Sequence, residues 1–187
     1  MGWRPFLSFK INLMNHKINI VLFGIGKAGS ALINKAVKSR KELAIEEQID
    51  IRFPVITNST VAFFEKEGAK YSWEANFIQF SIPFKLENVV DYVYANNLEN
   101  VVAVDATGSA EFIKEYAGLV KSGFNLVSIN DNLKNQHPDF ENEVSRTALN
   151  RGLDYNFIDL PKGNDKAAAH ELFEAILAIA QKTKAVA

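Results

Sequence analysis

The sequence predicts an α/β fold: a doubly wound parallel sheet of about six strands, with helices on both faces. Two observations support this prediction. Short apolar runs rich in β-branched residues lack polar alternation, which is typical of strands buried on both faces of a parallel sheet. Between these runs lie segments of helical length with one apolar face, and parallel strands need such helical crossovers.

This alternation continues along most of the chain. We expect strands over residues 18–23, 51–57, 77–81, 101–104, 125–129 and 155–159. We expect helices over residues 27–47, 61–67, 85–96, 110–121, 138–150 and 166–184. No internal repeat or low-complexity tract interrupts this order, so one sheet is expected.

Local signals mark where several elements begin and end. The polar stretch Asn58-Ser59-Thr60 closes the second strand, and Pro83 precedes the third helix. Ser122-Gly123 is a typical helix stop, and Pro138 suits a first helical turn, where its missing N–H is not needed. The last helix carries an apolar stripe that favours packing on its own sheet, with a dimer interface as the alternative: Leu172, Phe173, Ile176, Leu177 and Ile179.

Composition excludes several classes of function. Lys plus Arg number 21 and Asp plus Glu number 22, so no net field favours nucleic acid or an anionic membrane. The chain has no cysteine, which excludes disulfides and thiolate catalysis. Its three histidines are far apart in sequence, so no metal site is expected. No run of about 20 apolar residues predicts a membrane span, and a cytoplasmic location is expected.

A glycine pattern stands where the first strand meets the first helix. Gly24, Gly26 and Gly29 have the spacing G-x-G-x-x-G. In that setting the first glycine permits a tight turn, the second leaves room for a pyrophosphate, and the third lets the helix pack closely. N–H groups at the helix start then bind the phosphates. The pattern predicts a Rossmann-type dinucleotide cradle, formed by Gly24, Ile25, Gly26, Lys27, Ala28 and Gly29. The alternative is a turn that needs glycine for its backbone angles alone.

Neighbouring residues exclude two competing nucleotide sites. A nucleoside-triphosphate loop needs glycine five positions before its second glycine and Ser or Thr after the lysine. Val21 and Ala28 occupy those positions here. The acidic residue expected in the first strand of a methyltransferase is also missing.

The end of the second strand bears on the choice of cofactor. An acidic residue there would bind the adenosine ribose of NAD, but the chain has Asn58 and Ser59. Nothing in this stretch repels a 2′-phosphate, so we expect NADP or NAD to be accepted without strong discrimination. An equal alternative is that Asn58 and Ser59 only turn the chain.

Four blocks of sequence resemble a known family. They read INIVLFGIGKAGSALIN, IDIRFPVITNSTVAFFEKEG, WEANFIQFSIPFKLENVVDYV and NLENVVAVDATGSAEFI. They resemble the nicotinamide-binding domain of homoserine dehydrogenase, above all the dehydrogenase half of bifunctional aspartokinase–homoserine dehydrogenases. The resemblance covers about residues 17–130.

The resemblance implies roles for residues beyond the glycines. Asn58 and Ser59 would lie near the adenosine ribose, and Asp105, Ala106 and Thr107 would approach the nicotinamide half. Strand ends are where such sheets bind ligands. For Asp105 and Thr107 the equal alternative is that they cap the following helix.

The chain departs from the family in two ways. The family's fifth strand ends in Asn-Lys, with the lysine in the active site, whereas here Asn130 is followed by Asp131. A lysine there stabilises the negative charge that develops on the substrate oxygen, whereas an aspartate would repel it. Asn130 and Lys134 are the catalytic candidates that remain. The family also continues into a substrate domain. Here Leu160-Pro161-Lys162-Gly163 only faintly echoes its Gly-Leu-Pro turn, and one loop and helix follow.

These features divide the chain and leave three functions open. We expect a leader over residues 1–16, a dinucleotide-binding domain over 17–160, and a terminal loop and helix over 161–187. The favoured function is a module that binds cofactor without full turnover. The second is an active oxidoreductase that interconverts aspartate semialdehyde and homoserine, with a separate substrate-domain chain or on another small substrate. The third is a remnant with an empty cleft. A homodimer is also possible.

Overall fold

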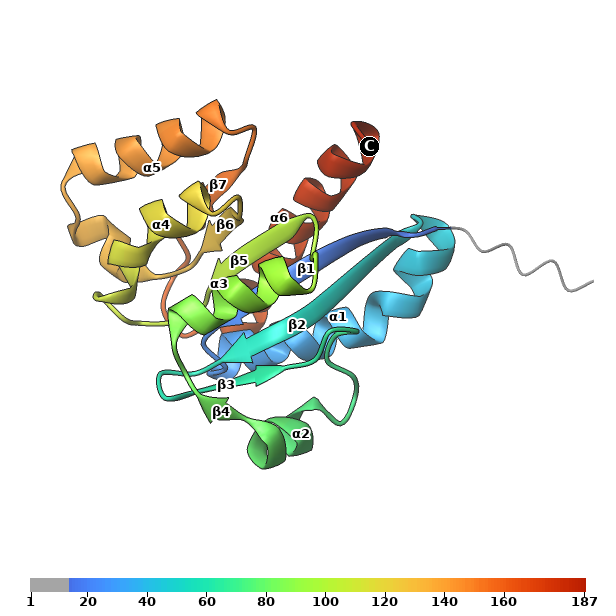
Figure 1. Cartoon of the computed structure of the whole chain (residues 1–187). Coiled ribbons are helices and arrows are strands. Elements are labelled where there is room, and N and C mark those ends of the chain that lie inside the picture. The colour runs from blue at the N-terminus through green and yellow to red at the C-terminus, as the bar shows by residue number, and fades with distance from the viewer. Residues whose placement is uncertain (1–13) are drawn as a thin grey trace, which may run out of the picture.

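The computed structural model describes residues 14–187, and a seven-stranded sheet forms its centre (Figure 1). The strand order is β4-β3-β2-β1-β5-β6-β7. The strands are β1 (His16–Phe23), β2 (Ile49–Thr57), β3 (Val61–Phe64), β4 (Ile82–Pro83), β5 (Val101–Asp105), β6 (Asn125–Ser128) and β7 (Tyr155–Phe157). The five strands β2, β1, β5, β6 and β7 run parallel, whereas β3 is antiparallel to β2 and β4. The predicted α/β fold class is confirmed.

Helices cover both faces of this sheet (Figure 1). The α-helices are α1 (Lys27–Glu46), α2 (Trp73–Phe80), α3 (Leu86–Ala95), α4 (Tyr116–Lys121), α5 (Pro138–Asn150) and α6 (Asp165–Ala185). Two 3-10 helices, η1 (Phe112–Glu115) and η2 (Asp131–Asn135), follow β5 and β6. Helices α1, α2 and α6 contribute to one apolar cluster, and α3, α4 and α5 to the other.

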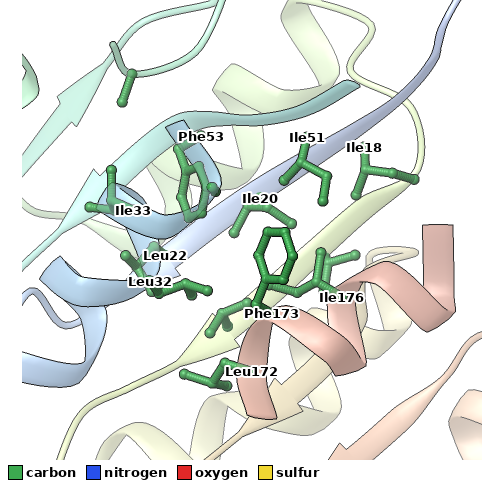
Figure 2. Packing of buried hydrophobic residues seen from close by; sticks show 14 of the residues in the cluster. Ile18, Ile20, Leu22, Leu32, Ile33, Ile51, Phe53, Leu172, Phe173 and Ile176 are labelled. Atoms are coloured by element: carbon green, nitrogen blue, oxygen red, sulfur yellow. The ribbon is translucent and has the colours of Figure 1, made fainter. Parts of the chain in front are cut away.

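Strand β1 shows why the sequence lacks polar alternation. Its side chains point alternately to the two faces of the sheet. Ile18, Ile20 and Leu22 pack on the α1 and α6 side, as Figure 2 shows, whereas Val21 and Phe23 join the opposite cluster. All five are at most 1% exposed. Both faces of the strand are therefore core.

The apolar stripe of the last helix is part of that core. Leu172, Phe173 and Ile176 of α6 lie beside β1 and α1 in Figure 2 and belong to the same cluster. Each is at most 5% exposed. The stripe therefore packs on the chain's own sheet.

Two predicted elements are wrong, and both lie between β2 and α3. Residues 61–67 do not form a helix, because Val61–Phe64 is a strand whose residues pair with Val55–Thr57 across a tight hairpin. Residues 77–81 do not form a strand, because Trp73 and Phe77, four positions apart, are buried together on one face of helix α2. The sheet thus has seven strands rather than about six.

The leader expected over residues 1–16 falls outside the described residues up to position 13, and His16 already belongs to β1. The remaining parallel strands and their crossover helices lie close to their predicted places. Helix 110–121 differs in detail, because η1 occupies its first part and α4 its second.

Candidate functional site

A cleft of about 820 Å³ opens at the carboxyl ends of β1, β2 and β5. Its walls come from the turn after β1, the hairpin after β2, the start of α3, the loop after β5 and η1. Strand β1 has β2 on one side and β5 on the other, and α3 is the connection that crosses between them (Figure 1). The cleft therefore lies at the point where the strand order reverses, which is where open α/β sheets bind ligands.

The three glycines of the turn have different local requirements. Gly24 has φ of 97°, and a Cβ there would lie 2.8 Å from the carbonyl oxygen of Ala106. A Cβ on Gly29 would overlap the carbonyl oxygen of Gly24, so the helix can approach the turn only with glycine there. A Cβ on Gly26 would meet no atom within 4 Å. Packing and backbone angles thus explain Gly24 and Gly29, but neither explains Gly26.

The start of α1 lies behind Gly26, which is its N-cap residue. No side chain caps this end of the helix, and its first turn contains no acidic residue. The first N–H groups of a helix lack partners within the helix and carry a partial positive charge. Lys27, Ala28 and Gly29 are the first residues of α1. The arrangement can bind an anion beside Gly26.

The hairpin after β2 forms the neighbouring wall. The side-chain oxygen of Asn58 accepts hydrogen bonds from the N–H groups of Thr60, at 2.9 Å, and Val61, at 2.8 Å. This bonding closes the hairpin. It leaves the side-chain NH₂ of Asn58 and the hydroxyl of exposed Ser59 as the polar groups that the hairpin offers to a ligand.

Asp105, the last residue of β5, lies beneath the cleft rather than along its wall, and its exposure is 0%. Its Oδ1 accepts the N–H of Thr107 at 2.8 Å. Its Oδ2 accepts the Tyr116 hydroxyl at 2.6 Å and the Asn130 side-chain nitrogen at 2.9 Å. The carboxylate therefore joins the loop after β5 to α4 and to the end of β6, and it holds Ala106 and Thr107 at the cleft.

Asn130 extends this buried network, and its own exposure is also 0%. Its side-chain nitrogen donates to the carbonyl oxygen of Ser109 at 2.8 Å, and its oxygen accepts the N–H of Asn132 at 3.2 Å. Tyr116 and Ser128 share a hydroxyl–hydroxyl hydrogen bond of 2.5 Å beside it. Asn130 thus joins the loop after β5 to η2, which follows β6, and it does not line the cleft.

Burial controls the protonation of this network. Burial raises the pKa of Asp105, and hydrogen bonds from Tyr116, Thr107 and Asn130 offset only part of the increase. The pKa of Tyr116 is raised by burial and then by the neighbouring Asp105 carboxylate. Tyr116 therefore stays protonated and donates its hydrogen bond.

Lys134, the remaining catalytic candidate, does not line the cleft. The Nζ of Lys134 is 2.5 Å from Asp159 and 3.5 Å from Asp131, in a partly exposed cluster on and beside η2. The hydrogen bond to Asp159 raises the pKa of Lys134. Lys134 and Asp131 are both absent from the cleft lining.

Sequence reasoning missed the apolar wall of the cleft. Between ring centroids, Phe112 lies 4.5 Å from Phe23, and Phe84 lies 6.2 Å from Phe23. Leu86 and Glu115 also line the cleft. These residues come from the end of β1, the start of α3 with the residues just before it, and η1, which are far apart in sequence.

Over residues 14–187, no group of three or more His, Asp or Glu side chains is arranged to hold a metal ion. The helices of the same region include none that is long and apolar enough to cross a membrane.

Comparison with known proteins identifies two distant relatives. The bifunctional aspartokinase/homoserine dehydrogenase of Buchnera aphidicola is 24% identical over 136 residues, which are 72% of this chain and 16% of that protein. Its counterpart from Haemophilus influenzae is 26% identical over 139 residues, or 73% and 17% of the two chains. The chain is a distant homologue of homoserine dehydrogenase. No family model matches the sequence.

Solved structures agree with this relationship at the level of the fold. Homoserine dehydrogenase from Thermoplasma acidophilum matches 75% of this chain and 43% of its own, with a TM-score of 0.58 and 16% identity. A hyperthermophilic archaeal homoserine dehydrogenase in complex with NADPH gives the same coverage and identity with a TM-score of 0.57. A Candida auris protein of unknown function gives 0.61, 16% identity, and coverage of 75% and 38%.

The match is the size of a domain. The chain spans about one-sixth of the length of the two aspartokinase/homoserine dehydrogenases and less than half of each solved chain. What the homology supports is the relationship to the homoserine dehydrogenase region that contains the α/β sheet.

Proposed function

We propose that the chain binds a nicotinamide dinucleotide, NADP or NAD, in the cleft and does not by itself carry out homoserine dehydrogenase turnover. One observation carries the proposal: Gly26 faces open space at an uncapped helix start, at the strand-order reversal. A phosphate would occupy the volume that a side chain at Gly26 would fill. The distant homologue crystallised with NADPH supports the choice of ligand.

The residues of the cleft divide into binding and supporting groups under this proposal. Residues 24–29 hold the pyrophosphate, Asn58 and Ser59 hold the adenosine ribose, and Ala106 and Thr107 contact the far half of the cofactor. Asp105 and Asn130 act from below by fixing the loops. The bound group would supply hydride chemistry. The chain's own residues bind and orient it. Residues 17–160 form the binding unit, 161–187 complete its core, and the protein works in the cytoplasm.

The absence of turnover rests on the positions of the charged side chains. No lysine or arginine lines the cleft within residues 14–187. Lys134, which sequence suggested as a replacement for the family's lysine, is paired with two aspartates elsewhere. Within residues 14–187, the wall of the site therefore has no cationic side chain to stabilise negative charge on a substrate oxygen.

Thermal or urea unfolding tests the binding. NADPH or NADH at about 100 times its Kd should add about 2.7 kcal/mol to the free energy of unfolding. Gly26→Val should fold and lose this increase, because its side chain enters the phosphate position. Gly118→Val is the matched control, since Gly118 on α4 also faces open space but does not line the cleft. No stabilisation of the wild type by either cofactor would refute the proposal.

A second candidate is an active oxidoreductase that uses a separate substrate-domain chain. The homology to homoserine dehydrogenases supports it. Addition of aspartate semialdehyde and NADPH to the chain alone, and again in the presence of a separate substrate-domain chain, distinguishes the two. Oxidation of NADPH in the second mixture, measured by absorbance, would establish the oxidoreductase, and a retained signal in both mixtures would favour the binding module. We also propose a homodimer, which a measurement of the protein's mass in solution tests.

A further inference from the structure

The cleft has an aromatic side chain on two of its walls. Phe84 lies just before α3, and Phe112 is the first residue of η1. The ring of Phe23, at the end of β1, packs against both. Phe23 is only 1% exposed, whereas Phe84 and Phe112 are half-buried. A ligand in the cleft can therefore contact either of these two outer rings, and Phe23 supports them from the core.

Main-chain contacts fix Phe84 beside the hairpin that follows β2. The N–H of Phe84 donates to the carbonyl oxygen of Thr60 at 2.8 Å. The residue before it, Pro83 of β4, pairs with Val61 of β3. Phe84 therefore lies next to the polar tip of the hairpin. Phe112 belongs to the other wall, because η1 follows the loop after β5, and β5 lies on the far side of β1 from β2.

The wall beside the hairpin is apolar. Phe84 and Leu86 line the cleft there, and both side chains are half-buried. Lys85, which lies between them in sequence, lines an adjoining hollow and not the cleft. Such a surface suits a flat neutral ring rather than a phosphate, because a charge buried against apolar side chains loses its hydration without compensation.

We infer that the adenine ring of the bound dinucleotide packs against the Phe84 ring, with Leu86 beside it. The inference rests on the proposed function and extends it to the base. Adenine is bonded directly to the ribose that Asn58 and Ser59 are proposed to hold, so it lies within reach of a side chain fixed to that hairpin. Aromatic side chains bind the faces of nucleobases by stacking, and loss of such a ring weakens binding about tenfold.

Calorimetric titration with ADP-ribose and with the reduced cofactor, NADH or NADPH, tests the inference, because these ligands all contain adenine. Phe84→Leu keeps an apolar side chain in the wall but removes the ring. Its Kd for ADP-ribose and for the reduced cofactor should rise about tenfold. Reduced nicotinamide mononucleotide has no adenine, so its Kd should be the same for Phe84→Leu and the wild type.

Phe64→Leu is the matched control. Phe64 on β3 belongs to the same hairpin, is also half-buried and packs against the same apolar cluster as Phe84, but it does not line the cleft. The control should bind all three ligands as the wild type does. Urea titration of both variants shows that each is folded under the conditions of the binding experiment.

The outcomes separate this inference from the proposed function. If neither reduced cofactor binds the wild type, the proposed function itself fails. If a reduced cofactor binds but ADP-ribose does not, or if Phe84→Leu leaves both Kd values unchanged, the inference is overturned while cofactor binding stands. A loss of ADP-ribose binding in Phe112→Leu instead would assign adenine to the other wall. An equal loss for reduced nicotinamide mononucleotide in Phe84→Leu would show that Phe84 shapes the whole cleft, which also contradicts the inference.

Discussion

Two hollows of about 820 Å³ lie at opposite ends of the sheet, and each has a buried carboxylate beside it. At the carboxyl end, Asp105 is satisfied by neutral donors: a backbone N–H, a tyrosine hydroxyl and an amide. At the amino end, Asp50 on β2 is satisfied by two arginines. Its oxygens lie 2.7 Å from the Nε atoms of Arg40 and Arg52.

The difference shows how the partners of a buried carboxylate decide its charge. Burial acts to raise the pKa of both groups. At Asp50 the hydrogen bonds and charges of Arg40 and Arg52 outweigh burial, so its pKa is lowered. At Asp105 neutral donors do not outweigh it, and the pKa is raised. No cationic side chain therefore contacts the buried carboxylate at the carboxyl end of the sheet. We propose that helix N–H groups bind the anionic part of the dinucleotide there.

The largest effect is expected from removing the Asp105 carboxylate beneath the cleft. Asp105→Ala leaves the Tyr116 hydroxyl, the Asn130 amide and the Thr107 N–H without their shared acceptor in a fully buried place. We expect a loss of about 3 kcal/mol in the free energy of unfolding, measured by urea titration. A loss of less than about 1 kcal/mol would mean that the network does not hold the loops together.

The equivalent change at the other end should cost less. Asp50→Ala removes two ion pairs, but Arg40 and Arg52 keep 27% and 15% of their side-chain surface exposed and so reach water. Arg52 also retains Glu67, whose carboxylate lies 2.8 Å away. We expect a loss of about 1–2 kcal/mol in the same titration. A loss equal to that of Asp105→Ala would remove the distinction between the two ends.

Elements marked by local sequence signals could be predicted, whereas elements decided by tertiary contacts could not. Strand β1 and helix α1 were predictable, because an apolar run, a glycine turn and a long helix are local signals. Residues 61–67 and 77–81 were assigned the wrong structure, because periodicity does not distinguish a strand from a helix in such short segments. Pairing with β2 and packing against α1, which short-range patterns do not encode, decide their conformation.

The candidate site divides in the same way. Sequence predicted that residues 24–29 and 58–59 bind one cofactor, and the structure brings Gly24, Ile25, Gly26, Asn58 and Ser59 together in the cleft lining. Sequence placed Asp105 and Asn130 correctly at strand ends. It could not show that both side chains are buried beneath the cleft and hydrogen-bonded to each other. Phe84 and the two η1 residues Phe112 and Glu115 lie at the same cleft only because the strand order brings the start of α3 and the loop after β5 together.

Removal of the Tyr116 hydroxyl tests how much one donor contributes to the network around Asp105. Tyr116→Phe removes one donor to Asp105 and the hydrogen bond to Ser128, while the ring keeps its packing against Phe112 and Phe140. We expect a loss of about 1 kcal/mol, smaller than for either carboxylate. Urea titration measures it. A neutral result would assign the stability of the network to Asn130 and the Thr107 N–H.

The smallest effects lie in the dependence of stability on pH, where the two carboxylates act in opposite directions. The raised pKa of Asp105 means that the folded chain holds this proton to higher pH than the unfolded chain. Its contribution is full below the ordinary carboxyl pKa and is lost as pH rises through the raised value. The lowered pKa of Asp50 means that its contribution is full above the ordinary range and is lost as pH falls through the lowered value.

Isosteric variants separate these slopes even where they change the overall stability. Between about pH 7 and about pH 3, Asp105→Asn should lose more stability on acidification than the wild type, because it lacks the group that gains by protonation. Asp50→Asn should lose less, because it has no ion pair to neutralise. Urea titrations across this range give both slopes, each relative to the wild type at the same pH. Slopes that change in the same direction in both variants would show that the partners of the two carboxylates do not set their charges.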